Sequence, residues 1–81
     1  MEIKLSDKAI KSFKDAPASV RRAFEKQLKF LVSNLLYPSL RAKKYDESQN
    51  LWQARVNNHW RFYFTITGNL YLIEDIIKHP K

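Results

Sequence analysis

The hydrophobic positions change their period once along the chain, from helical spacing in the first half to alternation in the second. Residues 2–6 alternate and predict a short strand, after which Ser6 can cap a helix that has Asp7 in its first turn. Apolar residues then recur at helical spacing, and Pro17 predicts that this helix ends at about Asp15.

A second helix is predicted from Ala18 to about Leu36. Its apolar positions recur every three or four residues, at Val20, Phe24, Leu28, Leu31, Val32 and Leu35. The polar positions between them are expected to face solvent, and they are Arg21, Arg22, Glu25, Lys26, Gln27 and Lys29. The two helices, joined by a short turn that contains proline, are expected to form an amphipathic hairpin with one face for a core.

Residues 37–50 show no clean period and are interpreted as a connecting loop. Pro38 blocks helix continuation, and the turn-forming residues are Asp46, Ser48 and Asn50. The loop carries three basic residues, Arg41, Lys43 and Lys44.

Alternation then predicts three strands, Leu51–Val56, Trp60–Ile66 and Leu70–Ile77. Asn57–Asn58 and Thr67–Asn69 are the predicted turns between them. Alternation in the last strand is weaker, because two acidic residues are adjacent there.

These elements predict an α+β fold of order β-α-α-β-β-β in a single domain, residues 1–81. Consecutive strands with short turns indicate an antiparallel meander. The N-terminal strand and helical hairpin are expected on the face of the sheet that carries Trp60, Phe62 and Phe64.

Composition supports a folded domain. Of 81 residues, 44% are hydrophobic, and five Phe, four Tyr and two Trp suffice for a compact core. There is no cysteine, which excludes disulfides and cysteine-based zinc sites. We expect no signal peptide and no membrane span, and the simplest expectation is a cytoplasmic protein.

The charge balance favours a polyanionic partner. Lysine and arginine total 15 against 8 acidic residues, a formal net charge of +7. On so small a body this points to nucleic acid, the ribosome or an acidic protein segment. The alternative is that the charge serves only solubility.

The face of the sheet opposite the helices is expected to carry Arg55 and Arg61 close together across the first hairpin turn. Two like charges placed opposite each other normally destabilise a sheet, so an anion between them, most naturally a phosphate, is predicted. The alternative is that both arginines are solvated or paired with Glu74 or Asp75.

Basic groups approach this face from three places: the arginine strands, the basic loop and the tail that ends in Lys78–Lys81. Tyr63 and Tyr45 can stack on bases, although Tyr45 can equally anchor the loop. The candidate RNA contacts are Arg41, Lys43, Lys44, Gln53, Tyr63, Lys78 and Lys81.

This surface has the groups that RNA cleavage through the 2′-hydroxyl requires. His79 can accept the hydroxyl proton or protonate the leaving oxygen, since histidine changes charge near neutral pH. Arg55 and Arg61 can stabilise the phosphorane. His59 is a weaker candidate, expected to be structural.

Other chemistry has little support in the sequence. Asp46 or Glu47 could act as a base if the loop folds over the sheet, but capping or solvation is favoured. The sequence has no glycine-rich phosphate loop, no metal-type cluster and no Ser-His-Asp pattern. We therefore expect no metal and no cofactor.

The order and spacing of these features resemble the RelE/ParE superfamily of toxins from type II toxin–antitoxin systems. The run "LRAKKYDESQNLWQARVNNHWRFYFTI" is similar to the family's basic loop, its Leu-aromatic-x-x-Arg strand, a turn and an aromatic-Arg strand. The terminal "IIKHPK" is similar to the family's last strand and the His or basic residue that follows it. The resemblance covers nearly the whole chain.

This resemblance implies a ribosome-dependent mRNA endonuclease that a cognate antitoxin silences, and it admits a toxin–antitoxin hetero-oligomer. Catalysis would use basic residues rather than a metal: Arg61 matches the arginine after the hairpin turn, Arg55 and Gln53 match strand positions that are often basic, and His79 matches the position after the last strand. Many RelE-type toxins continue with further basic residues and a tyrosine, whereas this sequence ends at Lys81. The resemblance therefore also admits a ParE-like DNA gyrase inhibitor or a non-catalytic binding member.

Overall fold

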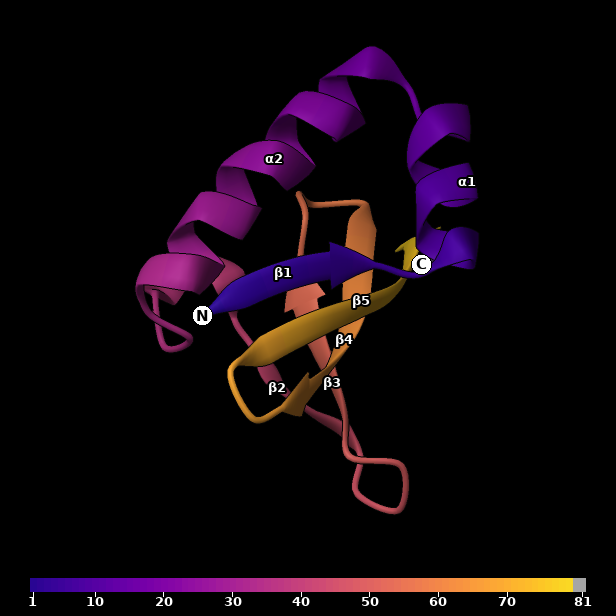
Figure 1. Ribbon diagram of the computed structural model, residues 1–81. Helices are drawn as coiled ribbons and strands as arrows, with labels where there is room; N and C mark the ends of the chain where they lie inside the picture. The colour runs from indigo at the N-terminus through magenta and orange to yellow at the C-terminus, as the bar shows by residue number, and fades with distance from the viewer. Residues whose placement is uncertain (80–81) are drawn as a thin grey trace.

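The computed structural model describes residues 1–79 and places two helices against one five-stranded sheet (Figure 1). The elements in chain order are β1 (Glu2–Leu5), α1 (Asp7–Asp15), α2 (Ala18–Ser33), the 3-10 helix η1 (Pro38–Leu40), β2 (Lys43–Asp46), β3 (Leu51–Arg55), β4 (Trp60–Thr67) and β5 (Leu70–Lys78). The predicted α+β fold is confirmed.

The strand order in the sheet is β1-β5-β4-β3-β2. Strands β3 to β5 form the antiparallel meander that the short turns predicted, and β2 adds a further antiparallel strand at its edge. Strand β1 pairs with β5 in parallel, with Glu2 opposite Leu70 and Leu5 opposite Ile73. The first and last strands of the chain are therefore neighbours, and the long connection between them runs through both helices, η1 and strands β2 to β4.

The prediction that residues 37–50 form only a loop is wrong, because this segment contains η1 and the edge strand β2. Lys43 and Lys44 lie opposite Gln53 and Trp52. Most of β2 is exposed, so it has no buried face to create an alternating pattern. Charged residues are typical of an edge strand, since they discourage pairing with another chain.

Helix α2 ends at Ser33, three residues before its predicted end. Asn34 caps it through a backbone hydrogen bond of 2.8 Å to the carbonyl of Phe30, and its side chain accepts from the Leu36 amide in the following turn. The ring of Tyr37 then stacks on Phe30 at a centroid distance of 4.0 Å. Within residues 1–79, neither helix is long and apolar enough to cross a membrane.

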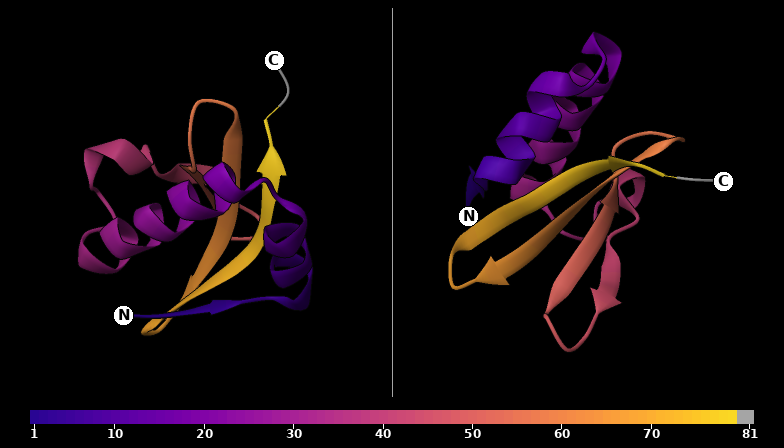
Figure 2. Two further views of the ribbon diagram at one scale, coloured as in Figure 1. Left: turned by 90° about the horizontal axis from the view of Figure 1, so that it is seen from above. Right: turned by 90° about the vertical axis from the view of Figure 1, so that its right-hand side faces the viewer.

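The core lies between α2 and the face of the sheet predicted to be covered (Figure 2). Phe62 and Phe64 are fully buried, and Phe24 of α2 meets Phe62 edge-on at 5.3 Å between ring centroids. Aromatic pairs at this geometry add stabilisation beyond the area they bury. The predicted inward face of β4 is therefore confirmed.

Gln27 was expected to face solvent, and that expectation is wrong. Only 6% of this residue is exposed. Its Nε2 donates to the carbonyl oxygens of Ser39 at 3.0 Å and Arg55 at 2.7 Å, while its Oε1 accepts from the Ser39 hydroxyl. A buried amide is tolerated when its polar atoms are paired. Gln27 thus connects α2 to η1 and to the end of β3.

A β-bulge explains the weak alternation in the last strand. Tyr63 lies opposite Asp75 and Phe64 opposite Ile73, so Glu74 is the extra residue in β5. The predicted cap of α1 is also confirmed, because the Ser6 hydroxyl oxygen accepts from the Ala9 amide at 3.0 Å.

Candidate nucleic-acid interface

Arg55 and Arg61 lie directly opposite each other on β3 and β4, as the predicted register requires. Both guanidinium groups are fixed by the turn between the strands. Arg55 donates to the side-chain oxygen of Asn58, and Arg61 donates to the carbonyl oxygens of Asn57 at 2.7 Å and Trp60 at 3.0 Å. The asparagines were recognised from the sequence only as turn formers, and nothing in their spacing indicates that they also orient the arginines.

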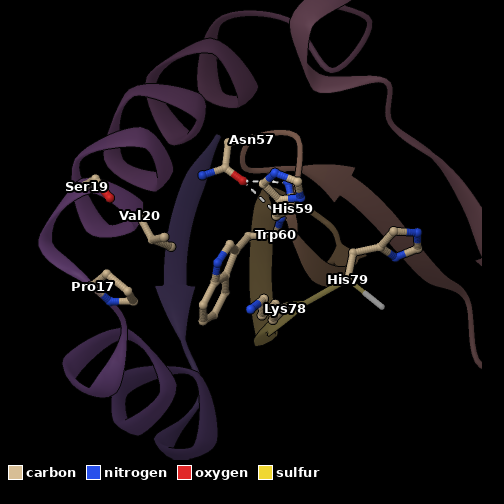
Figure 3. Close-up of a pocket in the computed structure, with 8 residues that line it drawn as sticks. All are labelled: Pro17, Ser19, Val20, Asn57, His59, Trp60, Lys78 and His79. Atoms are coloured by element: carbon tan, nitrogen blue, oxygen red, sulfur yellow. Dashed lines mark hydrogen bonds between the residues drawn. The ribbon is translucent and has the colours of Figure 1, made fainter. Parts of the chain in front are cut away.

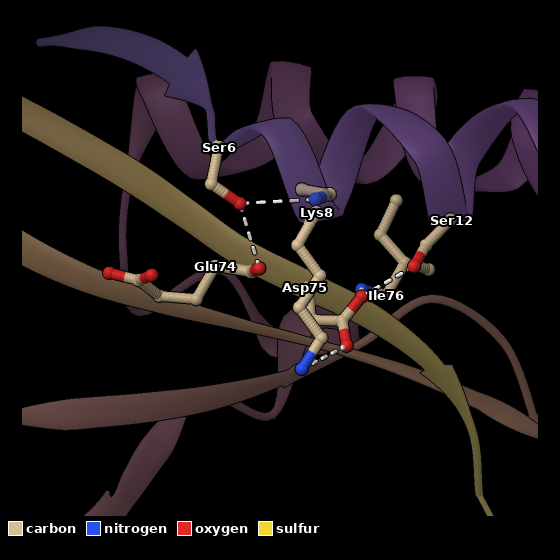
Figure 4. A network of polar contacts seen from close by, with 7 residues as sticks. Ser6, Lys8, Ser12, Glu74, Asp75 and Ile76 are labelled. Carbon is tan, nitrogen blue, oxygen red and sulfur yellow. Dashed lines mark hydrogen bonds and ion pairs between the residues drawn. The ribbon is translucent and has the colours of Figure 1, made fainter.

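Among residues 1–79, no carboxylate forms an ion pair with either arginine. The alternative partners are engaged elsewhere (Figure 4). Asp75 accepts from the Ser12 hydroxyl at 2.6 Å and lies 3.4 Å from the Lys8 ammonium group. Glu74 accepts from the Thr65 hydroxyl. The two like charges therefore face each other without a neutralising acid in the described chain.

The paired arginines line a cleft of about 240 Å³ on this face of the sheet. Its walls are formed by Arg41, Lys43, Gln53, Ala54, Arg55, Arg61 and His79. Side chains from the basic segment, the two arginine strands and the end of β5 thus meet in one place. This placement matches the convergence expected from the sequence, and it creates a site suited to a phosphate.

Arg41 reaches the cleft from a left-handed backbone conformation, with φ of 47°. It caps η1, and its amide donates to the Pro38 carbonyl at 3.3 Å. For a residue other than glycine this conformation costs about 1–2 kcal/mol. The neighbouring contacts of η1 with Gln27 hold the turn, so the position of Arg41 depends on the buried amide network.

Gln53 and Tyr63 form one unit at the end of the cleft. The Gln53 Nε2 donates to the Tyr63 hydroxyl at 2.9 Å, and Gln53 is buried. Tyr45 packs edge-on against Tyr63 with 5.1 Å between ring centroids, yet 58% of Tyr45 is exposed. Tyr45 therefore anchors β2 and also leaves a ring surface open to solvent.

His79 continues the hairpin pairing beyond β5, because its amide donates to the carbonyl of His59 at 2.6 Å. This bond holds the backbone of His79 beside the arginine cleft. His79 also borders a second, larger pocket of about 700 Å³ between the start of α2 and the β3–β4 turn (Figure 3). That pocket is lined by Pro17, Ser19, Val20, Asn57, His59, Trp60, Lys78 and His79.

Of the candidate RNA contacts among residues 1–79, Lys44, Tyr63 and Lys78 do not line the arginine cleft. Lys78 borders the larger pocket in Figure 3. The Lys44 ammonium group lies 5.4 Å from the centre of the Trp52 ring, a cation–π contact. Lys81 falls outside the described residues.

The acidic residues of the β2–β3 loop are used for local structure. The Asp46 carboxylate accepts from the Ser48 hydroxyl at 2.7 Å and from the Ser48 amide at 3.0 Å. The hydrogen bond from the Ser48 hydroxyl is the main cause that lowers the pKa of Asp46. Asp46 thus serves the capping role favoured by the sequence. The described part of the chain contains no group of three histidine or acidic side chains arranged to hold a metal.

The sequence matches no protein-family model and no curated protein. Solved structures do match. The YoeB/ParE toxin from Agrobacterium tumefaciens has a TM-score of 0.82 at 9% identity, covering 99% of this chain and 100% of that one. RelE in the RelE–RelB complex of Pyrococcus horikoshii OT3 has a TM-score of 0.81 at 14% identity, with coverage of 99% and 96%.

A third similar structure is the heterotetrameric YoeB–YefM toxin–antitoxin complex from Staphylococcus aureus, with a TM-score of 0.79 at 19% identity, covering 99% of this chain and 98% of that one. At these identities the likeness establishes the fold. The chain therefore has the fold of RelE/ParE-superfamily toxins, as the resemblance implied.

Proposed function

We propose that this protein is the toxin of a type II toxin–antitoxin system and cleaves mRNA on the ribosome. The observation that carries the proposal is the pairing of Arg55 with Arg61 in a cleft that His79 also lines. Without an acidic partner in the described residues, the two guanidinium groups form a site for the negative charge of a phosphodiester.

In the proposed reaction, the 2′-oxygen of one nucleotide attacks the adjacent phosphorus while its proton is removed. The bond from phosphorus to the 5′-oxygen of the next nucleotide then breaks, and that oxygen gains a proton, which leaves a 2′,3′-cyclic phosphate and a 5′-hydroxyl. Arg55 and Arg61 stabilise the phosphorane. His79 transfers a proton in one of the two steps.

Phosphates beyond the scissile one would be held by the surrounding basic side chains. Arg41 and Lys43 lie in the cleft itself, and Gln53 positions the Tyr63 ring at its end. The more distant contacts are proposed for Lys44, Lys78 and Lys81. Such contacts supply affinity that does not depend on base sequence and that weakens with salt.

The proposed protein partner is an antitoxin whose acidic segment covers the basic cleft. A second feature that supports a partner is the group of apolar side chains exposed at the end of α2. Val32 is 45% and Leu36 78% exposed, and Tyr37, whose ring stacks on Phe30, is 37% exposed. Exposed apolar clusters often mark protein interfaces. Co-expression with an adjacent acidic reading frame tests this, and recovery of only free toxin would contradict it.

The nuclease proposal is tested by toeprinting on translating ribosomes. We expect cleavage by the wild type and a loss of about 100- to 1000-fold in Arg61→Ala, the range for removing one transition-state donor. Arg22→Ala, which removes an exposed charge from α2, is the matched control and should retain cleavage. Undiminished cleavage by Arg61→Ala would reject the proposed site.

A second assay distinguishes the proposed nuclease from the alternatives, a ParE-like gyrase inhibitor or a non-catalytic binding protein. Because one structural neighbour is described as a YoeB/ParE toxin, the fold does not distinguish the two branches. Inhibition of gyrase supercoiling together with an absence of mRNA cleavage would establish the alternative. Cleavage without any effect on gyrase would exclude it.

A further inference from the structure

A third pocket, distinct from the one in Figure 3, lies on the same side of the sheet as the arginine cleft and next to it. It has a volume of about 300 Å³ and is lined by Lys8, Tyr45, Leu51, Tyr63, Glu74, Asp75 and Ile77. Two contacts join it to the cleft. Tyr63 accepts a hydrogen bond from Gln53, and Ile77 lies opposite Arg61 in the sheet. A ligand held by the arginines can therefore extend directly into this pocket.

Glu74 is the unusual group in the pocket. One of its carboxylate oxygens accepts from the Thr65 hydroxyl at 3.3 Å, and within residues 1–79 no lysine or arginine pairs with it. It is half-buried, and the bulge directs its side chain away from that of Asp75 (Figure 4). An unneutralised carboxylate on a chain of net charge +7 is placed to accept hydrogen bonds from a ligand.

The Asp75 carboxylate, in contrast, is already paired within the protein and is not free to bind a ligand. It accepts from the Ser12 hydroxyl and from the Ile76 amide, and Lys8 neutralises it. Asp75 therefore holds α1 against β5, while Glu74 faces the pocket.

The other walls suit a flat aromatic ring. Tyr45 is 58% exposed and packs in a T-shaped arrangement against Tyr63, so the two rings form a partly exposed aromatic wall against which a base can pack. Tyr63 lies two residues from Arg61 along β4, a step of about 7 Å. A nucleotide whose phosphate contacts Arg61 can therefore place its base against these tyrosines.

We propose that this pocket binds a guanine base next to the scissile phosphate and that Glu74 determines the specificity. This inference rests on the proposed function and adds a substrate preference to it. Guanine is the only common RNA base with two adjacent donors on its Watson–Crick edge, the N1–H and the 2-amino group. A carboxylate accepts both, whereas adenine, cytosine and uracil each place an acceptor beside their single donor group.

The test uses binding alone, so it does not depend on cleavage. Fluorescence anisotropy would measure binding of labelled, non-cleavable 2′-O-methyl pentanucleotides UUGUU, UUAUU and UUCUU. We expect the wild type to bind UUGUU about tenfold more tightly than the other two. Glu74→Gln should lose this preference and retain its affinity for UUAUU. Glu47→Gln, which removes an exposed acid from the β2–β3 loop, should behave as the wild type does.

Equal affinity of the wild type for all three oligonucleotides would overturn the proposal, as would a preference that survives in Glu74→Gln. GMP alone should bind more weakly than UUGUU, because it lacks the flanking phosphates, and equal binding would contradict the link to the arginine cleft. A guanine preference without ribosomal cleavage would reject the proposed nuclease activity and support the proposed guanine pocket. Cleavage with no guanine preference would support the nuclease activity and reject the guanine pocket.

Discussion

The side-chain amide of Gln27 donates a hydrogen bond of 2.7 Å to the main-chain carbonyl of Arg55. A residue in the middle of α2 thereby fixes the backbone from which one of the two cleft arginines extends. The same side chain also donates a hydrogen bond to the Ser39 carbonyl and accepts one from the Ser39 hydroxyl, next to the turn that presents Arg41. Stability and site geometry are therefore coupled through one buried polar side chain.

Gln27→Leu is expected to lower the free energy of unfolding by about 1–3 kcal/mol, since it leaves two carbonyl oxygens and a hydroxyl without their partner. Urea denaturation measures this change. Gln49→Leu, at an exposed loop position, is the control and should change the unfolding free energy by less than about 0.5 kcal/mol. Equal effects of the two substitutions would show that the buried network contributes nothing.

Substituting the two histidines one at a time distinguishes proton transfer, proposed for His79, from backbone support, which His59 provides through its carbonyl. His79→Ala should reduce ribosomal mRNA cleavage by about 100- to 10,000-fold, the usual contribution of a general acid or base. His59→Ala should cleave at nearly the wild-type rate, because its contact with His79 uses only the main-chain carbonyl. Cleavage end-mapping over a range of pH gives both rates. A larger loss in His59→Ala than in His79→Ala would reverse the assignment.

Two aspartates provide a comparison of a buried and an exposed carboxylate. Asp75→Ala should lower the free energy of unfolding by about 1.5–3 kcal/mol, since Asp75 is buried and its carboxylate accepts from a hydroxyl and an amide beside Lys8. Asp15→Ala breaks only the exposed pair with Lys11 and should cost about 0.5 kcal/mol or less. Thermal and urea unfolding of both variants would show the difference, and similar small losses would refute the role given to Asp75.

The Asp46–Ser48 contact predicts a local pH dependence. Because the Ser48 hydroxyl lowers the pKa of Asp46, the folded state favours the ionised carboxylate. This contribution is present above the usual pKa of an aspartate and is lost as the pH falls through the lower folded-state value. In Ser48→Ala, carboxyl-carbon NMR titration should show the pKa of Asp46 rising toward its usual range. An unchanged pKa would mean that the hydroxyl is not the cause.

The sequence predicted those elements whose residues are buried on one side. Alternation identified β3 and β4 and placed Arg55 opposite Arg61, since Phe62 and Phe64 set the inward face. It did not reveal β2, whose residues are mostly exposed, or the bulge that separates Glu74 from Asp75.

The burial of Gln27 also could not be predicted, because its pairing depends on carbonyl groups of η1 and β3 that are remote in sequence. For the candidate site, the sequence identified the charged side chains that line the cleft. The asparagine contacts that orient its arginines and the pocket around Glu74 depend on three-dimensional placement.

The position of β5 between β1 and β4 affects how the protein is made. During synthesis, residues 1–69 leave the ribosome before β5, so β1 has no partner strand until β5 has emerged. The backbone contact that places His79 beside Arg61 forms only after this strand has emerged. The basic cleft is therefore incomplete until β5 has emerged from the ribosome.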